Sequence, residues 1–588
     1  MSNPLSRIPI ATILILNVIV GCVFVRAQQE GSSEIPTATL RAETRLVVVD
    51  AVVTDKKGQP VTGLQADDFT VEENGKKQKI SVLVPPRADN TRSLTQVPPG
   101  VLSNHPEHVS PSGPPTVLIL DVLNSQFKDQ AYVRSQMLKY VTEQIQVGHP
   151  MAILTLTNRL HVIQEFTSDP QVLLAAIKDF RPQPPVLQAA PPPPATEASP
   201  STGVRGGQAA SLLAAARTDV AEFADQQVGY DLERRTLITI DAMNLLAHML
   251  GGLQGRKSVV WMTSDLPFDL IPENRNVTNQ ELMATLPGQG SERSATVNAA
   301  GSLAAEARQL HDHEIKDAEA RLATADIAIY PVDLRGLVGG MDSSAAYPAS
   351  YNNDMNGAGI ANTALKQSGG LSASQDTLQE VASETGGKAY FNENEVRQGV
   401  SLAMTDDKSS YTIGYYPKNK NWDGKYRKVR IKVARSGTIV RCRRGYFAID
   451  TTQEKPNYDQ DVIATLNFNA PATQVSFMVQ LKTETPGKVQ AVFLIDAHTI
   501  TIEESGRGQK INVSLYATVF GSTGDMLASH VIKVDQLVDS DSYLQIVSRG
   551  MMVPIDIEVP RGSKEIRLAV VDNKTGLVGT VSGSLEIN

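Results

Sequence analysis

The sequence is poor in cysteine, with only Cys22 and Cys442 among its 588 residues. Cys22 lies inside a predicted export signal, so a cleaved chain would keep one thiol and could form no intramolecular disulfide. A cysteine-ligated zinc site and a redox-active cysteine pair are excluded for the same reason. We therefore expect the chain to be stabilised by burial of apolar side chains.

An excess of positive charge and the common catalytic motifs are also missing. The chain carries 55 Lys and Arg residues against 63 Asp and Glu residues, a net charge of -8, which argues against a general nucleic-acid binder because such proteins usually present a basic face. It contains no Gly-x-Ser-x-Gly, Walker, His-Glu-x-x-His or EF-hand motif, and no histidine adjoins a nucleophile in a recognisable pattern. We do not expect an enzyme.

The N-terminus has the pattern of a secretory signal. Arg7 supplies the positive end, residues 8–20 form the apolar core, and Val25-Arg26-Ala27 is a small-residue cleavage pattern. We expect export to the periplasm, the outer membrane or the cell exterior. Two alternatives stay open, because Ile19-Val20-Gly21-Cys22 resembles a lipobox that would lipidate Cys22, and the apolar run could also serve as an uncleaved anchor.

The length predicts three or four domains, since one hydrophobic core does not extend over 588 residues. Shifts in composition and in hydrophobic period give the boundaries. The predicted segments are a signal peptide (1–27), a linker (28–43), an N-terminal β module (44–84), a second linker (85–113), an α/β domain (114–406) with insertions at 181–207, 270–305 and 336–370, a β extension (407–450) and a C-terminal β-sandwich-like domain (455–588), in which only strands are expected.

The α/β domain is predicted from strands and helices that alternate along the chain. Thr116 to Leu120 is an uncharged run of apolar and β-branched residues, which is typical of a strand covered on both faces. A second such run is Ser258 to Thr263. This order predicts a largely parallel sheet with helices on both faces.

Acidic residues follow both buried strands, Asp121 after the first and Asp265 after the second. Ligands of open α/β sheets bind outside the carboxyl ends of the strands, so these acids, with Asn124 and Ser125, are the first candidate site. Two carboxylates and a hydroxyl are oxygen ligands of the kind that Mg²⁺ and Mn²⁺ take. The alternative is that strand-end acids cap helices and accept loop hydrogen bonds, with Asn124 capping the following helix.

Five blocks of the sequence, in order, resemble a bacterial VWFA-related family known from acidobacteria. They are VVVDAVVTDKKGQPVTGLQADDFTVEENGKKQKI (47–80), LILDVLNSQFKDQ (118–130), GRKSVVWMTSDLPF (255–268), IAIYPVDLRGL (327–337), and YTIGYYPKN with the DGKYRKVRIKV and RRGYFA segments that follow it. The resemblance spans about 44 to 448. It implies a von Willebrand factor type A (VWA)-like, doubly wound sheet with helices on both faces. The N-terminal β module and the C-terminal β-sandwich, which the strand patterns predict, flank this sheet.

The resemblance also implies a metal site on top of the sheet. The family builds it from Asp-x-Ser-x-Ser after the first strand, a threonine on a later loop and an aspartate after the fourth strand. In this sequence Asp121, Ser125 and Asp265 match, Leu123 replaces the first serine, and Thr236 or Thr239 could be the loop threonine.

We therefore expect an exported interaction or adhesion-type module at the cell envelope. A protein or glycan partner would complete a Mg²⁺ or Mn²⁺ ion held by Asp121, Ser125 and Asp265, with Thr236 as a further ligand. The alternatives are a structural scaffold without a metal site and a hydrolase without a recognisable motif.

Overall fold

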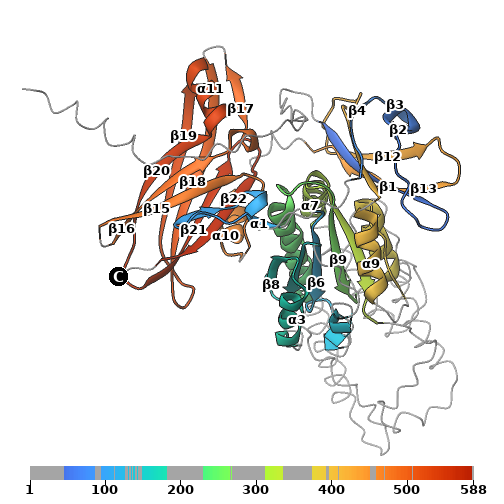
Figure 1. Ribbon diagram of the computed structural model, residues 1–588, viewed down its shortest axis with the longest axis horizontal. Helices are drawn as coiled ribbons and strands as arrows, with labels where there is room; N and C mark the ends of the chain where they lie inside the picture. Colours follow the sequence, from blue (N-terminus) through green and yellow to red (C-terminus); the bar gives the residue numbers. More distant parts are fainter. Residues whose placement is uncertain are drawn as a thin grey trace, which may run out of the picture. The chain divides into compact units, whose positions relative to one another are not determined.

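The computed structural model is drawn as a ribbon in Figure 1. The signal segment, the first linker and the predicted insertions (apart from Arg181) lie outside the residues that the structure describes. The described residues are 46–86, 95–110, 113–125, parts of 130–142, 149–181, 230–264, 266–267, 311–335, 374–391, 396–407, 409–449, 458–468, 470–485, 487–505 and 508–585. Among them, no helix has both the length and the apolar character that crossing a bilayer requires.

A five-stranded sheet forms the centre of the α/β domain, in the order β10-β9-β6-β7-β8. Its strands are β6 (Thr116–Asp121), β7 (Met151–Leu156), β8 (Leu160–Thr167), β9 (Lys257–Thr263) and β10 (Ile327–Asp333). All neighbours are parallel except β7 and β8, and Tyr390 adds one parallel bridge to Val332 beyond β10. Every residue of β6, β7, β9 and β10 is buried, as the continuous apolar runs predict.

Helices cover both faces of this sheet because successive side chains of each strand point to opposite faces. Val117 and Ile119 pack in a cluster with helical residues 230–250, α7 (Asp312–Thr324) and helical residues 374–385. Leu118 and Leu120 pack in another with α3 (Pro170–Asp179) and α9 (Val396–Asp407). The mixed α/β architecture therefore buries the central strands on two sides.

Strands that precede the α/β domain in the sequence and strands that follow it combine into one β-sandwich, which we call the composite sandwich. Segments 44–84 and 407–450 supply two four-stranded sheets, β13-β1-β11-β4 and β14-β12-β2-β3. Val47 pairs with Tyr415, and Val429 pairs with Glu73. Each segment supplies only two strands to each sheet, and a two-stranded ribbon is marginally stable, which explains the pairing over more than 300 residues. The strands are β1 (Val47–Asp55), β2 (Phe69–Glu73), β3 (Lys76–Gln78), β4 (Ile80–Val84), β11 (Ser410–Tyr415), β12 (Tyr426–Val433), β13 (Thr438–Arg441) and β14 (Gly445–Phe447), with a 3-10 turn, η2 (Ala66–Asp68).

The C-terminal domain is also sandwich-like, with a sheet β20-β16-β15-β5 and a sheet β17-β18-β21-β22 in which β19 also pairs with β18. Side chains from both sheets form one core cluster, which includes Phe477 and Phe493. The strands are β5 (Val101–Ser103), β15 (Phe477–Thr485), β16 (Lys488–Ile495), β17 (Ile502–Ser505), β18 (Gly508–Gly521), β19 (Met526–Val538), β20 (Met551–Glu558), β21 (Ser563–Asp572) and β22 (Val578–Ser584), with the 3-10 turn η5 (Ala497–Thr499).

Two helices in this domain correct the expectation that the tail contains only strands. They are α10 (Tyr458–Leu466) and α11 (Ser540–Arg549). The Asp539 side chain caps α11 by accepting a hydrogen bond from the Ser542 N–H at 2.8 Å, and Gly550 ends it at a φ of 85°. The capping aspartate and the terminal glycine were thus the local signals for a helix at this place.

The predicted linker 85–113 contributes β5 and the short helix α1 (Pro106–Val109), and Asn104 joins it to the C-terminal sandwich. The fully buried Asn104 amide donates to the carbonyls of Ala472 and Val475, each at 2.7 Å, and accepts from the Phe477 N–H at 2.8 Å. The linker is therefore anchored in the domain that lies more than 350 residues further along the chain.

We predict that Asn104→Ala lowers the free energy of unfolding by about 2 kcal/mol or more, because the buried Val475 carbonyl and Phe477 N–H lose their partner at about 1 kcal/mol or more each, whereas the Ala472 carbonyl keeps the Thr580 N–H. Urea unfolding followed by circular dichroism measures this change. Asn421→Ala, at an exposed side chain, is the matched control and should leave the midpoint unchanged. Equal midpoints for the two variants would show that the Asn104 contacts do not stabilise the fold.

Candidate functional site

The carboxyl ends of β6, β9 and β10 meet at one edge of the parallel sheet. β6 ends at Asp121 and β10 ends at Asp333, and Ser264 follows β9 directly. The side chains of all three are buried. This edge is the place where the sequence predicts a site.

Asp121 is surrounded by hydrogen-bond donors. Its Oδ1 accepts from the Asn124 N–H at 2.9 Å, and its Oδ2 accepts from Asn124 Nδ2 at 2.9 Å and from Trp261 Nε1 at 3.0 Å. These donors occupy three of the roughly four lone-pair sites that two carboxylate oxygens offer, and the Thr263 side chain adds an interaction that lowers the pKa of the carboxylate. Burial raises the pKa of Asp121, and the hydrogen bonds partly oppose that rise.

Asn124 connects this carboxylate to the helical residues 230–250. Its Oδ1 accepts from Arg235 Nε at 2.8 Å, and its Nδ2 also lies 3.4 Å from the Thr239 hydroxyl. The amide thus uses both its donors and its acceptor. Asn124 acts as a bridge between a buried acid and a partly buried guanidinium, a role that goes beyond capping the following helix.

The other predicted ligands have different surroundings. The Ser125 hydroxyl accepts from the Ser264 N–H at 3.2 Å. The Thr236 hydroxyl donates to the Leu232 carbonyl of its own helix at 2.9 Å. Leu123 is buried in the core cluster on one face of the sheet, and Asp265 lies outside the described residues. The structure therefore places Asp121 and Ser125 at the same edge, and the Thr236 hydroxyl is engaged with its own helix.

Sequence reasoning missed a second polar chain at this edge. Arg335 binds Asp333 through two hydrogen bonds of 2.8 Å and also donates to the Ser374 hydroxyl at 3.2 Å. Ser374 in turn donates to the Ser264 carbonyl at 3.2 Å. The sequence signal for this chain was an acid at the end of a third buried strand, with an arginine two residues later.

The described donor set does not fit a divalent cation. A cation needs free oxygen lone pairs, whereas both oxygens of the Asp121 carboxylate already accept hydrogen bonds, three in all, and Asp333 is held by a guanidinium. Among the residues that the structure describes, no group of three or more His, Cys, Asp and Glu side chains could hold a metal ion. What the arrangement does is fix the loops at the carboxyl edge of the sheet.

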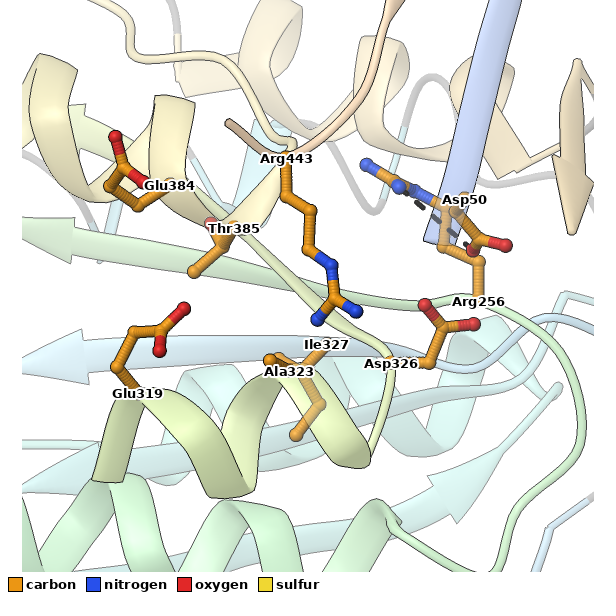
Figure 2. Close-up of a pocket in the computed structure, with 9 residues that line it drawn as sticks. All are labelled: Asp50, Arg256, Glu319, Ala323, Asp326, Ile327, Glu384, Thr385 and Arg443. Atoms are coloured by element: carbon orange, nitrogen blue, oxygen red, sulfur yellow. Dashed lines mark ion pairs between the residues drawn. The ribbon is translucent and has the colours of Figure 1, made fainter. Parts of the chain in front are cut away.

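A second polar cluster, unforeseen from the sequence, lies where the composite sandwich contacts the α/β domain. The cavity in this cluster is large enough for about one water molecule. Figure 2 shows the Arg443 guanidinium between Glu319 and Asp326, and the ion pair of Arg256 with Asp50. The lining residues are Asp50, Arg256, Glu319, Ala323, Asp326, Ile327, Glu384, Thr385 and Arg443.

Arg256 is the central cation of this cluster. Its Nη2 donates to the Tyr330 hydroxyl at 3.0 Å and to the Gly386 carbonyl at 2.7 Å. It also forms ion pairs with Asp50 of β1 at 3.9 Å and with Asp407 at 3.8 Å. Burial alone would lower the pKa of Arg256, but Tyr330 and the surrounding carboxylates raise it overall, so the guanidinium stays charged.

Two carboxyl groups of the cluster have pKa values near neutral pH. Burial raises the pKa of Glu319 on α7 to about 8, although Arg443 opposes the rise. Burial likewise raises the pKa of Asp407 to about 7, against the effect of Arg256. The cluster can therefore take up or release protons near neutral pH.

We predict that the protein loses stability as pH rises from about 4.5 to about 8, and that Glu319→Gln flattens this dependence. The pKa of Glu319 is higher in the folded protein than its ordinary value of 4.5. The contribution of Glu319 to the free energy of unfolding is therefore complete below pH 4.5 and is lost as pH rises through about 8. The span is at most about 5 kcal/mol. Urea unfolding at a series of pH values measures it. Glu314→Gln, on the exposed side of the same helix, should retain the wild-type slope.

We also predict that Asp121→Ala lowers the free energy of unfolding by about 3 kcal/mol in the presence of EDTA. The substitution leaves Trp261 Nε1 and Asn124 Nδ2 without their buried acceptor, and each unsatisfied donor costs about 1–3 kcal/mol. Asp67→Ala, at an exposed position, is the control. If the Asp121 carboxylate served mainly to bind a cation, its removal would leave the free energy of unfolding in EDTA unchanged, and that result would contradict the prediction.

Comparison with known proteins gives no family. No family model and no curated protein matches the chain. An aerotolerance-related membrane protein from Bacteroides fragilis is 13% identical over 50% of this chain and 98% of its own, with a TM-score of 0.22. A variant of the PilB minor pilin from Streptococcus sanguinis is 10% identical over 50% of this chain and 60% of its own, with a TM-score of 0.20. The pilus adhesin SpaC from Lactobacillus rhamnosus is 8% identical over 90% of this chain and 59% of its own, also at 0.20. Similarities at these TM-scores carry no argument about function.

Proposed function

We propose that this chain is an exported interaction module of the bacterial cell envelope, in which a VWA-like α/β domain binds a protein or glycan partner without a cation on Asp121. The export signal at residues 1–27 supports the location. The VWA-like assignment is supported by the order of the sheet, because β6 is its first strand along the chain and β9 its fourth. Asp121 and Asp265 then follow the two strands that the family resemblance requires.

The observation that carries the proposal is the set of protein donors around Asp121. Both of its oxygens accept hydrogen bonds, from the Asn124 N–H, Asn124 Nδ2 and Trp261 Nε1. Trp261 Nε1 can only donate, so it occupies a direction from which a cation would be repelled. We infer that the acid has a structural role at the edge where relatives of this fold would bind metal.

The rest of the edge supports metal-free recognition. Arg235 gives one N–H to Asn124 from a partly buried position, and Arg335, with a side chain that is 24% exposed, pairs with Asp333. The two guanidiniums balance the charges of Asp121 and Asp333 within the edge. Because Arg335 is partly exposed, its remaining N–H groups can still donate hydrogen bonds to an acidic or polar group of a partner in place of a cation.

We predict that titration of the full chain with Mg²⁺ or Mn²⁺ in a calorimeter gives only the heat of dilution. Capture of the partner from an envelope extract should also be equal in EDTA and in Mg²⁺. Saturable heat that Asp121→Ala removes and Asp67→Ala retains would contradict the proposal and support the cation mechanism. Turnover in a broad hydrolase screen would instead favour an enzyme.

A further inference from the structure

The long strand β19 (Met526–Val538) lies at an edge of the C-terminal sandwich. It pairs with β18 over most of its 13 residues, from Met526 to Val538. On the other side of β18 lie β21 and β17. No second strand among the described residues pairs with β19, so one row of its backbone N–H and C=O groups has no partner strand.

This edge is less protected against the addition of a strand than the corresponding edge of the other sheet. The corresponding edge strand of the other sheet, β20, contains Pro554 and ends in alternating acids, which block the addition of another strand. β19 has no proline, and its central residues carry one positive and one negative charge, on Lys533 and Asp535. Its exposed apolar residues include Val531 at 56% and Leu537 at 49%. An edge of this kind favours association.

We propose that β19 pairs antiparallel with β19 of a second copy of the chain, about a twofold axis at Val534, and joins the two C-terminal sandwiches into a continuous sheet. This contact uses only the C-terminal domain, so it does not depend on the role of Asp121. Main-chain hydrogen bonds along the two edges would supply the affinity, and the side chains would set the register.

The charge pattern of β19 selects this register. With Val534 opposite its own copy, Lys533 lies opposite Asp535 of the second copy, and the twofold axis repeats the pair. The same register places Val531 opposite Leu537, also twice. Opposed residues of antiparallel strands share one face of the sheet. In this register each charged side chain therefore lies opposite a side chain of the other sign, and each apolar side chain lies opposite an apolar one. Moving the axis to Ile532 would instead place Val531 opposite Lys533.

The ion pairs within one copy are compatible with this contact. Asp535 lies 3.2 Å from Lys510 of β18, with both side chains 44% exposed. A carboxylate can accept from two ammonium groups, so Lys533 of the second copy can join the existing pair. The dimer would thus add a cation to each Asp535 without breaking a contact of the single chain.

Sedimentation equilibrium of the full chain tests the proposal. We expect a reversible dimer whose dissociation constant rises at least about tenfold in Lys533→Asp and in Asp535→Lys, because each places like charges opposite one another twice. The double exchange of Lys533→Asp with Asp535→Lys restores the opposite charges, and we expect it to regain dimer formation.

Matched controls separate this contact from other effects. Lys564→Asp changes the same charge on β21, which β18 separates from the β19 edge, and should leave the dissociation constant unchanged. Thermal melting of each variant shows that it folds. A wild-type chain that is monomeric at all concentrations would overturn the proposal. So would a dimer that is insensitive to both single exchanges, or a double exchange that fails to restore it.

Discussion

A buried carboxylate must find hydrogen-bond donors within the protein, and the Asp121 carboxylate imposes this requirement on the centre of the α/β domain. Its donors come from the loop that follows β6 and from β9, the neighbouring strand. Asn124 passes the interaction on to Arg235 of the covering helix. The edge of the sheet is therefore fixed by a network in which the charge is balanced within the domain.

The same requirement governs the contact between the α/β domain and the composite sandwich. Arg256 is buried among groups from segments that are far apart in the sequence, including Asp50 of β1 and Asp407 at the end of α9. Arg441 of β13 pairs with Asp406 beside it. Removing one member of such a set leaves a buried charge without its partner, which costs several kcal/mol. Polar complementarity, as much as apolar burial, thus determines which surfaces of these two modules meet.

The central strands could be predicted from the sequence because their burial on two faces leaves a continuous apolar run. β6 ends at Asp121, where the pattern predicts its end. The composite sandwich could not be predicted in this way, since β1 pairs with β11 more than 350 residues away and nothing local in either strand identifies its partner. Likewise, α11 was not predicted, although Asp539 and Gly550 marked its ends.

The candidate site, like the fold, could be predicted only in part. Asp121 and Ser125 could be identified because both directly follow a predicted strand. The donors to Asp121 could not, because Trp261 lies 140 residues away and reads in the sequence as one more apolar residue of a buried strand. Leu123, which stands where the family that the sequence resembles has a serine, was the one local departure from that family's ligand pattern, and the structure places it in the apolar core.

The indole N–H of Trp261 gives the most direct test of this account. The chain has only two tryptophans, so a ¹⁵N-tryptophan spectrum contains two indole signals, and Trp422→Phe assigns them. We expect the Trp261 signal to exchange slowly with solvent and to have the same position in EDTA and in Mg²⁺, because its donor is bound to Asp121. A signal that exchanges rapidly, or that shifts with Mg²⁺ in a saturable way, would contradict the claim that Asp121 is satisfied within the protein.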